Sequence, residues 1–203
     1  MNVGSYSYDE YLHLVKSFHG NIAPGMVIGG FMVDLALRYI PEGIFFDALC
    51  ETPSCLPDAI QLLTPCTVGN GWLKILNLGR YALIFYEKRQ LEGTRVFLDA
   101  SKVDAWPEIK AWFFRLKSKK DQNFELLLEE IRKAGESICT LQKVVMKPQF
   151  VEGREHGGKI IRCPLCREAY PQSDGEMCRA CSGHVPYQVP VLLDKSGGNG
   201  HLP

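Results

Sequence analysis

Cysteine is the residue type with the most chemical potential in this sequence, and it occurs eight times in 203 residues. Four of the eight form two Cys-x-x-Cys pairs separated by eleven residues: Cys163, Cys166, Cys178 and Cys181. Each pair can turn both sulfur atoms towards one ion, and two pairs complete the tetrahedron of thiolates that Zn²⁺ accepts. The intervening turn sequence Ser173-Asp174-Gly175 predicts a hairpin that brings the two pairs together. We therefore predict a four-cysteine zinc site.

The predicted zinc ion has a structural role. A segment of this size with few apolar side chains has no adequate core of its own, whereas a structural zinc contributes about 10–16 kcal/mol of apparent binding energy. Four thiolates also leave no open coordination position for a substrate. A redox dithiol and an iron–sulfur cluster are the alternatives for the same four residues.

A second set of candidate ligands, His19, Cys55 and Cys66, lies in the first third of the sequence. All three are expected at loops or helix ends, where side chains can converge, and the start of a helix favours the thiolate of Cys55. Three ligands would leave one position of a zinc ion open. A histidine that activates one of these thiols would instead indicate nucleophilic catalysis. Cys50 and Cys139 are expected to be buried and inert, the second within a helix.

Helices and strands are predicted in separate runs over residues 1–150. Apolar spacing and cap signals, such as the Ser7–Glu10 capping box, predict helices at 8–18, 24–39, 56–63, 107–118 and 121–139, the last capped by Asp121. Strands are predicted at 44–49, 72–78, 80–86 and 94–98, with the second and third as an antiparallel pair. This order favours an α+β fold, with helices packed on a mostly antiparallel mixed sheet, over a doubly wound one.

The composition changes near residue 151, where glycine, charge and cysteine replace the apolar periodicity. We therefore expect three parts: a core domain at 1–150, a zinc-binding module of the ribbon type at 151–185, and a flexible or docked tail at 186–203.

Three motifs in the core, taken together, resemble the FwdE/FmdE family of formylmethanofuran dehydrogenase subunits. They are Phe18-His19-Gly20-Asn21-Ile22-Ala23-Pro24-Gly25, then Glu51 with Cys55 to Gln61, and then Thr64 to Gly71. The resemblance covers about residues 5–100, and the four-cysteine module is similar to the zinc finger that many members append. It implies an α+β core like the C-terminal domain of glyceraldehyde-3-phosphate dehydrogenase, a homodimer, and association with other dehydrogenase subunits.

The resemblance also implies that the core motifs bind a metal, Zn²⁺ or another. His19, Cys55 and Cys66 match the family's histidine and its two motif cysteines, and Asp58 and Gln61 match the residues that follow the first cysteine. Departures occur at the positions where the family usually has histidine, cysteine, lysine and asparagine, which are here Asn21, Ala23, Asn70 and Trp72.

Charge and hydropathy exclude several other functions. Lys+Arg and Asp+Glu each number 23, so the chain lacks the basic excess of a nucleic-acid binder. The longest apolar run, residues 22–33, is shorter than the roughly 20 residues of a membrane span, so we expect no membrane association and a cytoplasmic location. Dinucleotide-binding, phosphate-loop and Gly-x-Ser-x-Gly patterns are missing from the sequence. The alternative function is a zinc ribbon that contacts nucleic acid or a partner protein, with the core as a dimerisation platform; basic residues near the cysteines suit it, but acidic neighbours offset them.

Overall fold

The computed structural model describes residues 1–151, 159–186, 192–193 and 199–200. It divides into two compact units, residues 1–152 and 153–203, and each is described by itself. Most of the predicted tail at 186–203 lies outside the described residues. No single helix in the described part of the chain has the length and apolar content to cross a membrane, and α1 with α2 meets that test only as a pair bent by 119°.

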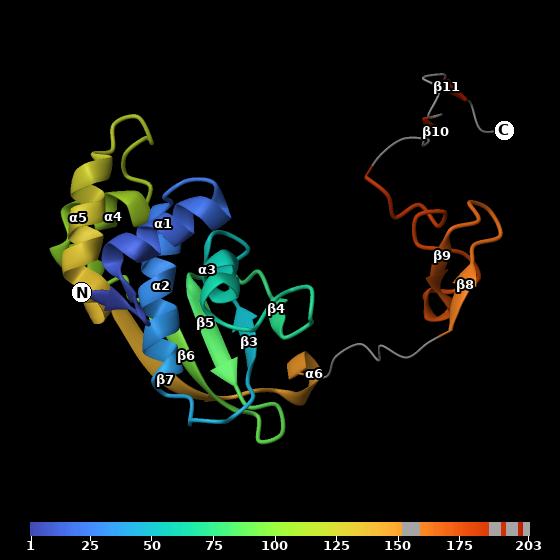
Figure 1. Cartoon of the computed structure of the whole chain (residues 1–203), viewed down its shortest axis with the longest axis horizontal. Helices are drawn as coiled ribbons and strands as arrows, with labels where there is room; N and C mark the ends of the chain where they lie inside the picture. Colours follow the sequence, from blue (N-terminus) through green and yellow to red (C-terminus); the bar gives the residue numbers. More distant parts are fainter. Residues whose placement is uncertain (152–158, 187–191, 194–198, 201–203) are drawn as a thin grey trace. The chain divides into compact units, whose positions relative to one another are not determined.

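The first unit is built on an open mixed sheet in the strand order β4-β3-β5-β6-β7 (Figure 1). Its strands are β3 (Asp47–Cys50), β4 (Leu73–Ile75), β5 (Ala82–Tyr86), β6 (Glu92–Leu98) and β7 (Cys139–Val145), and a two-stranded ribbon of β1 (Asn2–Val3) and β2 (Tyr6–Ser7) precedes them. All neighbours in the sheet are antiparallel except β3 and β4. The predicted α+β class with a mostly antiparallel mixed sheet is confirmed.

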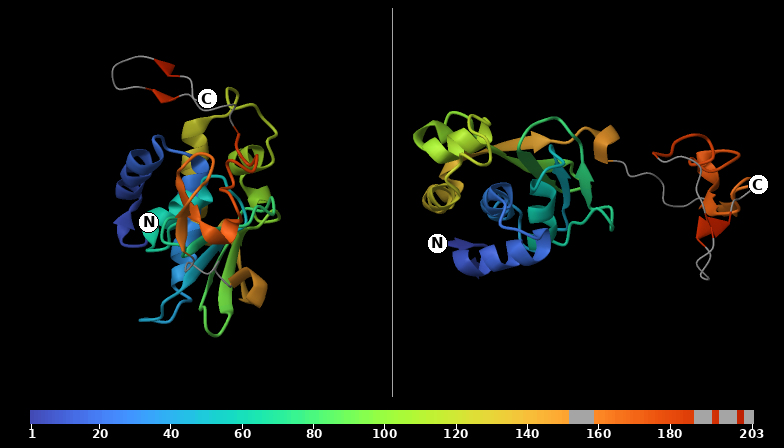
Figure 2. Two further views of the ribbon diagram at one scale, coloured as in Figure 1. Left: turned by 90° about the vertical axis from the view of Figure 1, so that its right-hand side faces the viewer. Right: turned by 90° about the horizontal axis from the view of Figure 1, so that it is seen from above.

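Six helices accompany the sheet. They are α1 (Tyr8–His19), α2 (Pro24–Leu37), α3 (Leu56–Leu63), α4 (Pro107–Phe113), α5 (Phe124–Ala134) and the short α6 (Pro148–Val151). Helix α2 packs directly on β5 and β6, α3 packs on α2 and on β3 and β4, and α1 lies on the outside of α2 and α3 (Figure 2). This arrangement sets the ends of α1, α2 and α3 near one another.

Helix α2 is the centre of the core, as its uniformly apolar sequence predicts. Ten of its fourteen residues are buried, and Pro24 occupies its first turn. Tyr11 of α1 lies against Gly30 and donates its hydroxyl to the carbonyl of Met26 at 2.8 Å. The predicted capping box of α1 is present, with Ser7 and Glu10 hydrogen-bonded to each other's backbone amides.

Two predicted elements differ in the structure. β4 is not the antiparallel partner of β5 but an edge strand parallel to β3, because the amides of Leu76 and Leu78 continue along the carbonyls of Cys50 and Glu51. The predicted helix at 121–139 ends at Ala134, and residues 139–145 form β7. Tertiary pairing with β6 decides the second case, since the same apolar residues fit either period.

Two local predictions change with them. Asn123, not Asp121, caps α5 and accepts a hydrogen bond from the amide of Leu126 at 3.1 Å. Cys139 lies in a strand rather than a helix, but it is buried, as is Cys50, and burial raises the pKa of both thiols to about 12. The expectation that these two cysteines are inert is in keeping with both findings.

Gly93 marks the closest approach of β6 to β5. A Cβ at this position would lie 2.6 Å from the carbonyl oxygen of Phe85. We expect Gly93→Ala to lower the free energy of unfolding by about 1–3 kcal/mol, measured by urea denaturation, because the backbone has to shift. In Gly69→Ala the new Cβ meets nothing closer than 3.9 Å, so this control should change stability by less than about 0.5 kcal/mol. Equal losses in the two variants would contradict the close approach.

The second unit contains a small antiparallel hairpin of β8 (Ile160–Arg162) and β9 (Ala169–Pro171). The first Cys-x-x-Cys pair lies in its turn, so the hairpin holds one pair rather than spanning the interval between the two, as the sequence predicted. The short strands β10 (Leu192–Leu193) and β11 (Asn199–Gly200) pair with each other further along the chain.

Candidate metal centre

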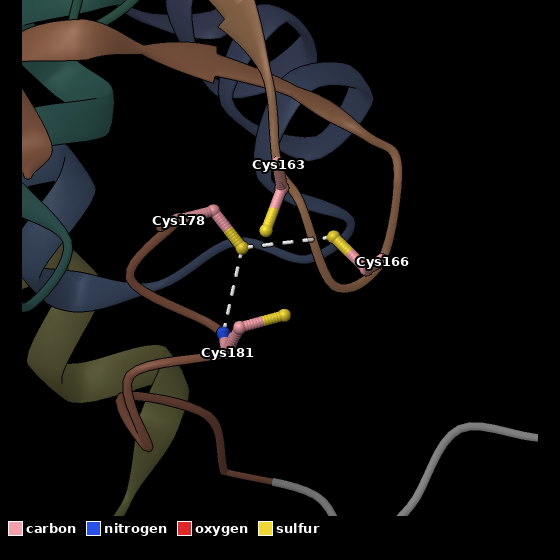
Figure 3. Close-up of side chains that lie close together, drawn as sticks. All are labelled: Cys163, Cys166, Cys178 and Cys181. Atoms are coloured by element: carbon pink, nitrogen blue, oxygen red, sulfur yellow. Dashed lines mark hydrogen bonds between the residues drawn. The ribbon is translucent and has the colours of Figure 1, made fainter. Parts of the chain in front are cut away.

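The four C-terminal cysteines converge on one point (Figure 3). One ligand atom from each lies within 4.8 Å of all the others. The Sγ atoms of Cys166 and Cys178 are 3.7 Å apart. A tetrahedron with Zn–S bonds of about 2.3 Å has edges of about 3.8 Å, so this separation suits one zinc ion.

Tight turns aim the sulfur atoms inward. The amide of Arg167 donates to the carbonyl of Cys163 at 3.0 Å and so closes the first turn, with Arg167 in the left-handed region at φ 67°. The second turn closes in the same way, from the amide of Ser182 to the carbonyl of Cys178 at 3.0 Å, and the amide of Cys181 donates to the Sγ of Cys178 at 3.4 Å. Amide-to-sulfur hydrogen bonds favour the thiolate, which is the form that binds metal.

The protonation of the four thiols favours a cation at their centre. Hydrogen bonds from backbone groups, chiefly at Cys178, lower the pKa of Cys163 to about 6. A hydrogen bond with the Cys178 thiol and burial raise the pKa of Cys181 to about 12. Four thiolates so close together repel one another unless a cation neutralises them. The donor set, four sulfurs in a tetrahedral arrangement, fits Zn²⁺.

The structure places the second candidate set differently. His19 is the last residue of α1, Cys55 immediately precedes α3, and Cys66 lies in the loop after α3. In the part of the chain that the structure describes, the C-terminal cluster is the one group of three or more potential ligands gathered this closely. The structure thus brings the four predicted ligands of the module together but does not gather His19, Cys55 and Cys66 into a second cluster.

His19 is nevertheless oriented as a metal-binding histidine would be. Its Nδ1 lies 2.7 Å from the Oδ2 of Asp58, and because a carboxylate accepts, Nδ1 carries the proton. The other ring nitrogen, Nε2, then has its lone pair available, which is the usual state of a metal-binding histidine whose far side is held by a carboxylate.

Asp58 and Gln61 connect this histidine to the loop that carries Cys66. The side-chain amide of Gln61 donates to Asp58 at 3.5 Å and accepts from the amide of Val68 at 3.2 Å. Asn70 holds the same loop by accepting from the amides of Thr67 and Trp72. These motif residues therefore position the end of α1 and the loop 64–72 relative to α3.

The two core cysteines carry protonated thiols in this arrangement. Cys66 is fully buried and donates its thiol to the carbonyl of Phe46 at 3.4 Å, and burial raises its pKa to about 11. Burial also raises the pKa of Cys55, assisted by the negative charge of Asp58, so the expected thiolate at the helix start is not favoured. Nucleophilic catalysis by either thiol is thereby disfavoured.

The backbone at Cys55 is strained. Its φ is 55° and its ψ is −47°, a combination that non-glycine residues rarely adopt. Gly25 makes room for it, since a Cβ there would lie 2.9 Å from the Cβ of Cys55. Such strain costs about 1–3 kcal/mol and gathers at functional positions, which marks Cys55 as a residue with a role.

Basic residues next to Cys55 were not singled out by the sequence. A cavity beside it is lined by Arg80, Arg95, Arg115, Lys117 and Lys119. These residues are spread over 40 positions and share no motif, so only their arrangement in the fold reveals them.

The fold and the four-cysteine centre together define an α+β protein with an appended zinc finger. A family model described as FmdE, molybdenum formylmethanofuran dehydrogenase operon, matches residues 18–147, and one described as FmdE treble clef zinc finger matches residues 154–188. The chain belongs to the FmdE family. The zinc-finger prediction is confirmed, and the matching model describes a treble clef where the sequence analysis expected a ribbon.

Two known proteins are similar over most of this chain. The crystal structure of an FmdE-like protein of the tungsten formylmethanofuran dehydrogenase type, from Syntrophus aciditrophicus, matches with a TM-score of 0.85 and 55% identity, covering 92% of this chain and 98% of that one. A protein of Archaeoglobus fulgidus named "Probable S-adenosyl-L-methionine-binding protein" is 28% identical over 83% of this chain. That match covers 51% of the relative, so the chain spans about half its length.

Proposed function

We propose that this protein is a zinc-binding relative of the FwdE/FmdE component of molybdenum and tungsten formylmethanofuran dehydrogenases. It holds one structural zinc ion in its C-terminal module and a second metal ion in the core, and it acts in the cytoplasm as a homodimer, together with dehydrogenase subunits. The convergence of four cysteine sulfurs within 4.8 Å is the observation that carries the zinc-binding part.

The first zinc ion stabilises the module and takes no part in a reaction. Two of its four ligands, Cys163 and Cys178, are buried, and all four coordination positions are filled by protein. A small cluster of Tyr170 with Ile161 and Met177 is the apolar core that the metal supplements. The role of the metal here is to hold the turns together.

The second site uses His19, Cys55 and Cys66. The orientation of His19 by Asp58 and the strained backbone of Cys55 support this proposal. Binding requires both thiols to lose their protons and the loop after α3 to approach the end of α1. Three protein ligands leave one position of the metal for water or another ligand.

Metal content per chain tests both sites. We expect about two zinc ions per wild-type chain, measured by inductively coupled plasma mass spectrometry after exhaustive dialysis. Cys178→Ser should keep the core ion and lose the module's, whereas His19→Ala should lose only the core ion, because each removes a ligand of one site.

The control is Cys139→Ala, which removes a buried cysteine that belongs to neither site and should leave the metal content unchanged. One zinc ion per wild-type chain, lost completely in Cys178→Ser and retained in His19→Ala, would refute the core site while upholding the zinc finger.

A further inference from the structure

A large cavity opens beside Cys55 in the first unit. Its volume is about 1060 Å³, which is at the upper end of the roughly 300–1,000 Å³ of cavities that bind small molecules. Its walls come from residues 52–55, from the segment 77–81, from the C-terminal half of β6, and from the loop that joins α4 to α5. The cavity therefore lies where four segments meet that are distant in the sequence.

The lining of this cavity is strongly basic although the whole chain is neutral. Five lining residues are basic, Arg80, Arg95, Arg115, Lys117 and Lys119, whereas Asp99 is the one acidic residue among them. Cationic side chains gathered in a concave site raise the local concentration of anions. The cavity is thus suited to a negatively charged ligand.

Protein carboxylates neutralise only part of this charge. The buried Glu51 is shared by two guanidinium groups, those of Arg95 at 2.8 and 2.9 Å and of Arg80 at 2.8 Å. Lys117 is paired with Glu108 at 2.6 Å. Within the described residues, neither Arg115 nor Lys119 has an ion-pair partner. These two cations and the half-neutralised arginine pair remain for a ligand.

The arginine pair is held in place before any ligand arrives. The side chain of Arg95 is 12% exposed, donates to Gln142 at 2.9 Å, and stacks over the ring of Phe97. The basic loop is anchored as well, since both Lys117 and Gln122 hydrogen-bond to Glu108 of α4. Preorganised donors bind an anion without the entropic cost of ordering long side chains.

Two helix starts add to the attraction for an anion. Gly25 in the first turn of α2 and Cys55 at the start of α3 both line the cavity, and neither helix has a side-chain cap. Their first amides and the positive ends of their dipoles favour negative charge.

Aromatic side chains form the remaining wall. Trp112 and Phe113 of α4 line the cavity together with Tyr81 and Phe97, and Trp112 lies edge-on to Tyr81 with ring centroids 6.4 Å apart. Such a wall favours a planar ring packed against it.

We propose that this cavity binds a small organic anion that carries at least two negative charges and a planar ring, with Arg115 and Lys119 contacting the charges. The binding is independent of the proposed core metal, because none of the cationic groups is a metal ligand.

Isothermal titration calorimetry on the full zinc-loaded chain tests this proposal. The probes are adenosine diphosphate, in which phosphates carry the charge, and benzene-1,3,5-tricarboxylate, in which carboxylates carry it. We expect at least one probe to bind in the micromolar to millimolar range, whereas uncharged adenosine does not. Affinity should fall as salt is added, because exposed charges are screened. The stronger of the two probes identifies the source of the charge.

A matched pair of variants separates the cavity from general surface charge. Lys119→Gln should weaken the stronger probe about tenfold, the loss expected for one charge-assisted contact. Lys120→Gln removes the same charge from the next residue, which does not line the cavity, and should change affinity less than about twofold. Arg115→Gln should behave like Lys119→Gln, and the metal content of all three variants should equal that of the wild type.

Several results would overturn the proposal. They are the absence of binding by both probes at millimolar concentration, equal binding of adenosine, equal losses in the Lys119 and Lys120 variants, and tighter binding of a single-stranded oligonucleotide than of either probe. The last would assign the basic loop to a nucleic-acid surface. None of these results bears on the two metal sites, so failure here leaves the proposed function to its own test.

Discussion

Cys178→Ser is expected to unfold the C-terminal module and to leave the core domain folded. Its apolar cluster consists of Cys163, Tyr170 and Cys178, with three partly buried neighbours, and two of those three buried residues are metal ligands. Loss of one ligand therefore removes both the metal and most of what is buried. Structural zinc contributes about 10–16 kcal/mol of apparent binding energy in modules of this kind, far more than the remaining contacts supply.

Hydrogen exchange followed by mass spectrometry measures this effect segment by segment in the full chain. Amides of residues 159–186 should lose protection in Cys178→Ser, and those of residues 1–151 should retain it. Arg179→Ala changes the neighbouring residue, which is not a ligand, and should preserve protection in both units. Chelation of zinc from the wild type should reproduce the variant. Full protection of residues 159–186 in the variant would show that the module folds without its metal.

Acid should release the same metal. Zinc binds the thiolate form, so metal binding releases protons and weakens as the pH falls. The low pKa of Cys163, about 6, keeps one ligand ionised at neutral pH, whereas Cys181, with a pKa of about 12, has to give up its proton to the metal. Zinc retention should therefore fall as the solution becomes more acidic.

Glu51→Ala is expected to produce the largest loss of stability in the core domain. The carboxylate of Glu51 is 2% exposed and bridges Arg95 and Arg80. Removal of one partner of a buried ion pair leaves an uncompensated charge and costs about 3–5 kcal/mol. In this variant the guanidinium of Arg95, itself 12% exposed, would be left without its carboxylate.

Urea denaturation of the wild type and the variant measures the difference, with Glu129→Ala as the control. Glu129 pairs with Lys133 on the surface at 2.6 Å, and both side chains are more than half exposed, so its loss should cost less than about 1 kcal/mol. Similar losses in the two variants would contradict the structural role of the buried bridge.

The pH dependence gives a second readout of the same bridge. Burial alone would raise the pKa of Glu51, but hydrogen bonds and charges from Arg95 and Arg80 outweigh it and hold the pKa below its usual value. A carboxyl whose pKa is lowered by folding stabilises the protein above its unfolded pKa, and this contribution is lost as the pH falls through the folded value. Glu51→Gln should therefore lose less stability than the wild type on acidification.

Local patterns predicted much of the core because the deciding interactions are short in range. The capping box of α1 needs only Ser7 and Glu10, and the start of α2 needs only Pro24, so both helix starts lie where the sequence places them. The sheet was less predictable. Residues 139–145 have an apolar pattern that fits a helix or a strand, and their pairing with β6 decides between the two.

The sequence by itself determined the zinc site, because two Cys-x-x-Cys pairs carry all four ligands within nineteen residues and each pair bends locally. It also determined the family, through motifs that are contiguous in the chain. Only the tertiary structure decided how His19 is held by Asp58, 39 positions away, and that Cys55 and Cys66 are buried and protonated. The basic cavity likewise exists only in the fold, because its cations come from separate segments whose side chains meet when the sheet and the α4–α5 loop are assembled.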